Sequence, residues 1–326
     1  MKNFDLRDSL SLQSPIDENL LKTLRRRAKF KQKKWDGAPP EFEKPVFIVS
    51  APRAGSTLLF EILSNFPNVW TTGGENHASI EGIPGLHPRS KNYASNALTN
   101  KDYSPETADK LRRRLTMDLQ DRDRRRYLDL NKNQARSKIR LIEKTPKNAL
   151  RIPFLRSVFP DALFIFLYRD PEENIASLME GWKSNRFIAY RNLPGWSREP
   201  WNFLLIPGWA ALKKASIAEI SACQWKTANR FIMDGLRNAS ATSWLFIKYK
   251  ELIKTPEKTI KKISAFAGLK TDGQIDDLLS NALPMSRMTL SPPSPDKWRK
   301  YEKEIKPLLS ELSSITKTLN KDARLI

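Results

Sequence analysis

The chain has 326 residues and carries 57 lysines and arginines against 36 aspartates and glutamates, which gives a formal net charge of +21. This length can form one large α/β domain with a substantial core, and two domains are possible but not required. The charge indicates affinity for polyanions, either a nucleic acid or a nucleotide with several anionic groups. Cys223 is the single cysteine, so an internal disulfide is excluded and a reducing cytoplasm is expected. No apolar run reaches the length of a transmembrane helix.

The first 43 residues are expected to form a basic helical extension. Residues 20–35 are rich in lysine and arginine and precede the first predicted strand. We expect this helix to pack on the outside of a single domain that spans residues 44–326. Contact with a membrane surface or a partner is the less favoured alternative.

The segment Pro45–Leu59 predicts an anion-binding site. Residues Val46–Val49 form an apolar run typical of a buried strand, and after a short loop of small residues the pattern becomes that of an apolar helix. Free backbone N–H groups converge where such a loop meets a helix start, and the helix dipole is positive there. The residues expected to contact the anion are Arg53, Ala54, Gly55, Ser56 and Thr57.

This loop differs from the Walker loop of nucleoside triphosphatases, G-x-x-x-x-G-K-[ST], because its cation precedes the glycine and no lysine follows. An ordinary strand–helix turn with an arginine in it is the simpler alternative. The pattern P-R-x-G-[ST]-[ST]-L resembles the 5′-phosphosulfate loop of sulfotransferases that use 3′-phosphoadenosine 5′-phosphosulfate (PAPS). In that family a lysine or arginine takes the place of Arg53. The resemblance implies an α/β fold of the P-loop type, a central parallel sheet flanked by helices, in one domain with helical insertions.

The segment Val69–His77 contains two glycines and a glutamate, Glu75, at the place where carbohydrate and tyrosylprotein sulfotransferases have a similar glutamate. The resemblance implies that Glu75 removes the proton from the acceptor hydroxyl, while Gly73 and Gly74 leave room for the acceptor. Considered alone, Glu75 would be a solvated loop carboxylate and His77 a polar packing residue. His77 is the second candidate for the base, with Glu75 then acting as its orienting partner.

Residues 102–140 are crowded with arginines, among which leucines recur at helical spacing. We expect a helical insertion of two charged amphipathic helices whose charged faces are solvated. The alternative is a basic surface for nucleic acid, which would account for the net charge and would show strongly salt-dependent binding. That alternative leaves the spaced phosphate motifs unexplained.

Two further elements match the same family in the expected order. The segment Glu143–Asn148 follows a short predicted strand, Arg140–Ile142, and resembles the K-[ST]-P element, whose lysine reaches the sulfuryl region. This implies that Lys144 is a second cation at the reacting group. After the predicted buried strand 162–168, Arg169 and Ser177 have the spacing of the R-[DHN]-P-x₅-S element, which binds the donor's 3′-phosphate. A guanidinium and a hydroxyl together suit a dianion, although alone they could equally belong to a surface loop and a helix.

Residues 181–225 hold eight aromatic side chains in a stretch broken by prolines. Some of these rings must belong to the core. So many aromatic residues directly after the phosphate-binding helix also indicate a lid over an acceptor pocket. The two interpretations are equally favoured by the sequence.

Two late segments complete the resemblance, which spans residues 44–310. Leu245–Tyr249 resembles the strand and helix beside the adenine, although Lys250 departs from the family's common glutamate. Residues 289–298 resemble the loop that grips the cofactor phosphates. The contacts implied by these two segments are Tyr249, Ser291 (or Ser294), Lys297 and Trp298.

Together the motifs imply an enzyme that transfers a sulfuryl group from PAPS to a hydroxyl of a small-molecule or carbohydrate acceptor, releasing 3′-phosphoadenosine 5′-phosphate (PAP). Such an in-line displacement at a charged centre depends on positioning and electrostatics. Arg53 and Lys144 would offset the charge that grows on the leaving phosphate. The late proline-rich segment is most similar in style to bacterial natural-product sulfotransferases, which makes natural-product biosynthesis the expected setting.

No metal is expected to be required. His77 and His87 are the only histidines, and neither has a second ligand at metal-site spacing. A P-loop kinase that uses ATP and Mg²⁺ is the alternative enzyme, and the missing G-K-[ST] argues against it.

Overall fold

The computed structural model describes residues 38–130, 137–292 and 294–322, and the structural statements below concern these residues. Most of the expected basic extension, residues 1–43, therefore lies outside them. Among the helices of the described ranges, none is long and apolar enough to span a bilayer.

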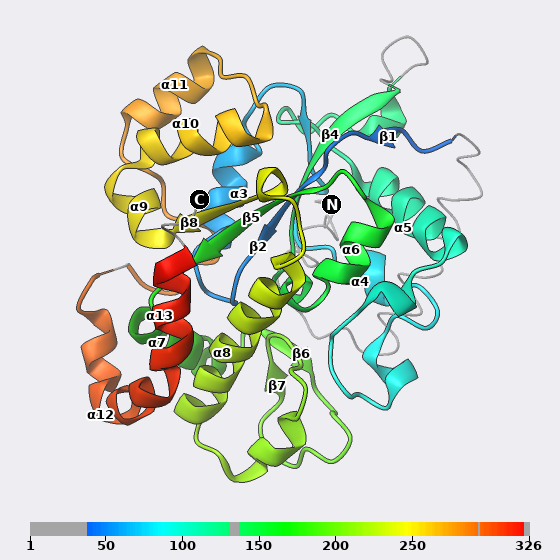
Figure 1. The fold of residues 1–326 in the computed structure, drawn as a ribbon. Helices are drawn as coiled ribbons and strands as arrows, with labels where there is room; N and C mark the ends of the chain where they lie inside the picture. The colour runs from blue at the N-terminus through cyan, green and yellow to red at the C-terminus, as the bar shows by residue number, and fades with distance from the viewer. Residues whose placement is uncertain (1–37, 131–136, 293, 323–326) are drawn as a thin grey trace, which may run out of the picture.

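The centre of the molecule is a parallel sheet of six strands with helices on both faces (Figure 1). The strand order is β1-β4-β2-β5-β8, and β3 pairs with β4. Every described pairing in this sheet is parallel, which confirms the expected α/β fold. The strands are β1 (Glu41–Phe42), β2 (Val46–Val49), β3 (Val69–Trp70), β4 (Lys138–Lys144), β5 (Leu163–Tyr168) and β8 (Trp244–Lys248).

The central strands are buried on both faces, as expected for a parallel sheet that helices cover. Successive side chains point to opposite faces, so Val46 and Ile48 belong to one hydrophobic cluster and Phe47 belongs to the other. The helices that cover the first cluster are α3 (Ser56–Leu63), α9 (Tyr249–Lys254), α10 (Pro256–Ala267) and α11 (Gly273–Ser280). Those that contribute to the second include α5 (Pro105–Asp118), α6 (Ile152–Val158), α7 (Pro171–Ser184), α8 (Ile217–Leu236), α12 (Glu302–Ile305) and α13 (Leu309–Asp322).

Strand β4 is longer than the predicted Arg140–Ile142. Its last residues, Glu143 and Lys144, pair in parallel with Phe47 and Ile48 of β2, and this pairing extends the strand. Lys144 therefore lies at the carboxyl end of a central strand and not in the loop that follows. Its position is set by the sheet, which holds a side chain more rigidly than a loop does.

The segment 102–140 differs from the two helices expected. Its described part contains one α-helix, α5, and the second run of arginines, residues 122–126, forms a tight turn. The carboxylate of Asp121 accepts the backbone N–H groups of Asp123 and Arg125, and Arg124 has a φ of 63°. Local bonds of this kind compete with helix formation.

Several arginines of this segment are engaged within the molecule and not only with solvent. Arg112 donates to the carbonyl of Val158, and Arg114 donates to the carbonyls of Ala78 and Gly82 at 3.2 and 3.1 Å. These contacts tie α5 to its neighbours. They give the arginine run a structural role that needs no nucleic acid.

The eight aromatic side chains of residues 181–225 are all buried. Two of them, Tyr190 and Trp201, belong to a small antiparallel sheet of β6 (Ile188–Tyr190) and β7 (Trp201–Asn202). The ring of Trp201 packs edge-on against Trp182 and Trp196, with centroids 5.4 and 5.0 Å apart. These rings form core; that the segment also acts as a lid stays a prediction.

Candidate active site

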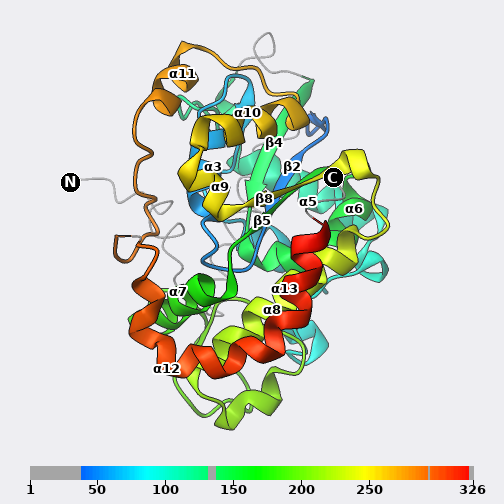
Figure 2. The ribbon, with the colours of Figure 1, turned by 60° about the vertical axis from the view of Figure 1, so that its left-hand side comes forward.

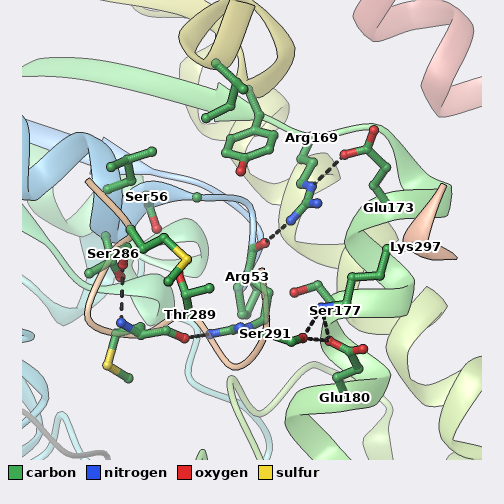
Figure 3. Close-up of a pocket in the computed structure, with 18 of the residues that line it drawn as sticks. Arg53, Ser56, Arg169, Glu173, Ser177, Glu180, Ser286, Thr289, Ser291 and Lys297 are labelled. Carbon is green, nitrogen blue, oxygen red and sulfur yellow. Dashed lines mark hydrogen bonds and ion pairs between the residues drawn. The ribbon is translucent and has the colours of Figure 1, made fainter. Parts of the chain in front are cut away.

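The loops that follow β2 and β5 meet at the carboxyl edge of the sheet and border a cavity of about 390 Å³. This edge is where open parallel sheets bind their ligands. Figure 3 shows Arg53, Arg169, Ser177 and Lys297 around the cavity. The sequence-predicted residues that line it are Arg53, Gly55, Ser56, Thr57, Glu75, Arg169, Ser177, Tyr249, Ser291, Lys297 and Trp298.

The loop between β2 and α3 has a backbone suited to binding an anion. Arg53 and Gly55 have φ values of 67° and 97°, in the left-handed region that favours glycine. A Cβ atom on Gly55 would lie 2.4 Å from two ring carbons of Tyr249, so this position has no room for a side chain. The bond from the N–H of Leu59 to the carbonyl of Gly55 closes the first turn of α3. The backbone N–H groups of the residues just before Leu59 have no acceptor within the helix, so they can bind a ligand.

Ala54 contributes to this loop from beneath and not at the cavity. Its side chain is fully buried, and its N–H donates to the carbonyl of Ala51 at 3.3 Å. Ala54 therefore supports the turn that the other loop residues form.

The guanidinium of Arg53 is held beside the cavity by two contacts. Its Nη1 donates to the carbonyl of Met288 at 2.7 Å, and its Cζ lies 4.6 Å from the ring centroid of Phe187. The Nε atom is buried and has no hydrogen-bond partner within the described ranges. Burial, with a further contribution from Arg169, lowers the pKa of Arg53 to about 10, so the group is still charged at neutral pH. A buried cation with an unused N–H suits an anionic ligand.

Arg169 is fixed on three sides at the end of β5. Its Nε donates to Glu173 at 3.1 Å, and its Nη1 donates to the carbonyl of Arg53 at 3.2 Å. Its Cζ also lies 4.5 Å from the ring centroid of Tyr249. Ser177 lines the same cavity from α7, one turn beyond Glu173. The structure thus brings the guanidinium and the hydroxyl of the second phosphate motif to one cavity.

The buried ammonium of Lys144 joins the loop to Glu75. The Nζ atom lies 3.0 Å from Oγ1 of Thr57 and 2.6 Å from Oε1 of Glu75, and the lysine side chain is 2% exposed. On its other side, Oε2 of Glu75 lies 2.8 Å from Nε2 of His77. Burial alone would raise the pKa of Glu75, but the charge of Lys144 and the His77 hydrogen bond outweigh it and hold that pKa well below its ordinary value. Glu75 is therefore an ionised carboxylate.

His77, at the start of α4 (His77–Glu81), lies behind Glu75. Glu75 lines the cavity, whereas His77 does not. Burial lowers the pKa of His77, the hydrogen bond with Glu75 opposes this, and the charge of Lys147 lowers it further. A neutral imidazole that donates from Nε2 orients the carboxylate. The geometry therefore favours Glu75 as the group that meets an acceptor and His77 as its support.

A buried ion network lies behind His77. Glu81 pairs with Lys147 at 2.9 Å and with Arg151 at 2.6 Å, and all three side chains are buried. Burial opposes the ionisation of Glu81, yet the two cations hold its pKa at about 2. Because removing one member would leave an uncompensated buried charge, this network fixes the position of α4.

The comparison with family models decides the assignment. The model of the Sulfotransferase family matches residues 45–273, which is more than half of the chain. The chain belongs to the sulfotransferase family. This membership confirms the resemblance found in the sequence and supports sulfuryl transfer over the kinase alternative.

Solved sulfotransferases resemble this one over most of its length. One from Mycobacterium avium has 14% identity and a TM-score of 0.48, covering 91% of this chain and 84% of that one. The sulfotransferase domain of the Synechococcus PCC 7002 olefin synthase has 21% identity and a TM-score of 0.44, covering 82% and 90%. A mouse sulfotransferase complexed with PAP has 16% identity and a TM-score of 0.40, covering 95% and 94%. A search of curated proteins finds no match.

A strap, defined as residues 281–298 apart from residue 293, borders the cavity of this sulfotransferase and runs from α11 to α12 (Figure 2). It is attached to α7 through Lys297, whose Nζ lies 2.7 Å from Oε2 of Glu180 and also donates to Oγ of Ser291. It is attached to the segment before Glu75 through Arg287, whose Nη2 donates to the carbonyl of Gly73 at 3.1 Å. A phosphate that bound Lys297 would compete with the carboxylate of Glu180.

Among the cavity residues that local sequence patterns did not assign to the site are Glu173, Glu180, Phe187 and Phe203. The two glutamates precede and follow Ser177 by four and three positions, a spacing that places all three on one helix face and could have revealed them. The two phenylalanines were noticed only as members of an aromatic stretch. The orientation of their rings depends on the pairing of β6 with β7, which no local sequence pattern predicts.

No metal site is apparent in the part of the chain that the structure describes. Groups of three or more histidine, cysteine, aspartate or glutamate side chains arranged to hold a metal ion are absent there. The expectation that no metal is needed stays a prediction.

We predict that His77 is less than half protonated at pH 6.5, where a free imidazole is half protonated. Burial and Lys147 lower its pKa, while Glu75 and Glu81 oppose that change. The folded protein then binds this proton less well than the unfolded chain, so protonation below about pH 6.5 favours unfolding. The chain has only two histidines, so ring NMR signals, assigned with a His87→Asn variant, report the charge directly. A His77 ring that is charged at pH 6.5 would refute the assignment of a neutral supporting imidazole.

Proposed function

We propose that this sulfotransferase moves a sulfuryl group from PAPS to a hydroxyl of a small-molecule or carbohydrate acceptor and releases PAP. One observation carries the proposal: residues of both phosphate motifs and the carboxylate of Glu75 border a single cavity. Family membership supports sulfuryl transfer in general, and the donor and the type of acceptor are our inference.

The residues around the cavity fit a donor with two separate anionic groups. The start of α3 with Arg53 suits the 5′-phosphosulfate, and Arg169 with Ser177 suits the 3′-phosphate. The Nε of Arg53 has no partner among the described residues, and such an anion would satisfy this donor. The ring of Tyr249, between Gly55 and Arg169, is a candidate neighbour of the adenine.

When bound, PAPS supplies the sulfuryl group, whose bond to the 5′-phosphate breaks with its electron pair left on PAP as the acceptor oxygen bonds to sulfur. Glu75 accepts the proton that the acceptor hydroxyl loses. Arg53, Lys144 and the N–H groups at the start of α3 offset the charge that develops on the leaving phosphate. Since Arg53 stays protonated, it acts by charge alone, whereas Lys144 can also donate a proton.

Lys144 connects the residues proposed to bind the donor with Glu75, the proposed base. Its Nζ reaches both Thr57 and Glu75, so a shift toward an anion in the loop would weaken its hold on Glu75. The proton affinity of Glu75 would then rise, because the charge that depresses its pKa would be shared. The base would thus be strongest when the donor is in place.

The proposal includes a cytoplasmic setting, which rests on the single cysteine, and binding of PAP without added metal. The metal-free binding follows from the number of cations and N–H donors that the cavity already offers.

Arg169→Ala is expected to weaken PAP binding by roughly 2–4 kcal/mol, because it removes one partner of a desolvated charge pair. Adenosine 5′-phosphosulfate, which lacks the 3′-phosphate, should lose far less. Calorimetric titration of both ligands measures the difference. Arg122→Ala is a matched control, since Arg122 also pairs with a carboxylate, Asp272, but lies outside the cavity. Equal losses for the two ligands would remove Arg169 from the 3′-phosphate site.

Glu75→Gln keeps the size of the side chain and removes the carboxylate, so kcat should fall by roughly 10²–10⁴, the usual contribution of a positioned base. PAP affinity should not fall, because the carboxylate faces the acceptor and its loss leaves the Lys144 ammonium free for the donor. His77→Ala should cost much less, since His77 supports Glu75 from behind. Steady-state kinetics of both variants test this order. A larger loss in His77→Ala would make the imidazole the base, and near-normal turnover in both would place the base elsewhere.

A further inference from the structure

We infer that the acceptor carries an apolar group next to its hydroxyl, as a phenol or a hydrocarbon alcohol does, and that Phe187 and Phe203 form the wall that receives it. The inference rests on the proposed function, because it places the acceptor in the same cavity as the donor. It narrows the acceptor to an apolar small molecule and disfavours a carbohydrate.

Two stacked rings form this wall. The rings of Phe187 and Phe203 are 5.0 Å apart at an interplanar angle of 23°, and both line the cavity. They are 2% and 7% exposed, so the surrounding core holds them firmly. A fixed apolar wall is thus part of the cavity before any ligand binds.

The backbone is strained to place the second ring. Phe203 has a φ of 62°, a conformation that costs energy for a residue with a side chain. Its N–H donates to the carbonyl of Phe187 at 2.9 Å, which fixes the two residues side by side. Strained backbone of this kind concentrates at functional sites, because it persists only where the structure holds it in place.

A glycine on α7 makes room for both rings. A Cβ atom on Gly181 would lie 2.3 Å from Cζ of Phe203 and 3.2 Å from Cδ2 of Phe187. Glycine in a helix interior is unfavourable, so its presence here needs a local reason. The close approach of the rings supplies that reason.

The wall stands beside Arg53, which is proposed to act on the leaving phosphate, and it shares the cavity with Glu75, the proposed base. The Cζ atom of Arg53 lies 4.6 Å from the Phe187 ring centroid, and Glu75 lines the same cavity. Phe187 and Phe203 lie outside the motifs assigned to the donor. An acceptor hydroxyl between Glu75 and Arg53 would therefore have its carbon framework against these apolar side chains.

This chemistry selects against a polyhydroxylated acceptor. The phenylalanine rings offer no hydrogen bond, so sugar hydroxyls pressed against them would lose their water partners without replacement. An apolar framework loses no such bonds and gains from leaving water. Sugars do pack on aromatic rings in other settings, so a carbohydrate is the competing acceptor that a test must separate.

The test is binding to the dead-end complex of the enzyme with saturating PAP, which requires no turnover. The probes are 2-naphthol, 1-hexanol and methyl β-D-glucopyranoside, each titrated by calorimetry. We expect the first two to bind and the glucoside to bind at least about tenfold more weakly, the scale on which an apolar pocket discriminates.

Two substitutions test whether 2-naphthol binds against the wall of Phe187 and Phe203. Phe203→Leu should weaken 2-naphthol about fivefold to tenfold and leave PAP affinity unchanged. Gly181→Ala keeps both rings but forces Phe203 from its place, so it should also weaken 2-naphthol while favouring the helix. Phe159→Leu is the control, since Phe159 is also a buried phenylalanine and lies outside the cavity.

The outcomes separate this inference from the proposed function. A protein that binds PAP but neither apolar probe, or that binds the glucoside as tightly as 2-naphthol, overturns the apolar acceptor. Unchanged 2-naphthol affinity in both Phe203→Leu and Gly181→Ala overturns the assignment to this wall. Absence of PAP binding in the wild type would overturn the proposed function and the inference with it.

Discussion

A buried ammonium group needs compensating partners, and Lys144 finds them on two sides of the active site. Thr57 lies in the first turn of α3, Glu75 follows β3, and Lys144 itself ends β4, where it pairs with Ile48. Removing one partner of such a pair typically costs about 3–5 kcal/mol, because a buried charge is left uncompensated. This contact sets the distance between the proposed donor loop and the proposed base. It also keeps Glu75 ionised, and the remaining side chains of the site are arranged around that pair.

Local patterns in the sequence predicted the sheet and the two phosphate motifs. Val46–Val49 is an unbroken apolar run because both faces of its strand are covered. Such a run predicts the burial of the strand from the residue types alone. Gly55 marks a turn that needs a left-handed backbone, and Arg169 and Ser177 have a fixed spacing in one strand–helix unit. Each of these features depends on residues close together in the chain, which is why the sequence could reveal them.

Features that depend on distant segments were not predictable in this way. The extension of β4 comes from its pairing with β2, and the contact between Glu180 and Lys297 joins α7 to the strap. The turn at residues 122–126 replaced a predicted helix because the side chain of Asp121 competes for the backbone. The aromatic stretch was noticed, but the direction of its rings follows from the packing of a small sheet. The same packing supplies the apolar wall from which we infer the acceptor class.

Calorimetric titration of the wild-type protein measures whether one cavity binds a nucleotide with separate 5′- and 3′-anionic groups. PAP without added metal and ATP with Mg²⁺ are the two ligands to compare. We expect PAP to bind without metal and more tightly than ATP with Mg²⁺, because Arg53, Arg169 and Ser177 are placed for two anionic groups. Tighter binding of ATP with Mg²⁺, or no binding of PAP, would contradict it.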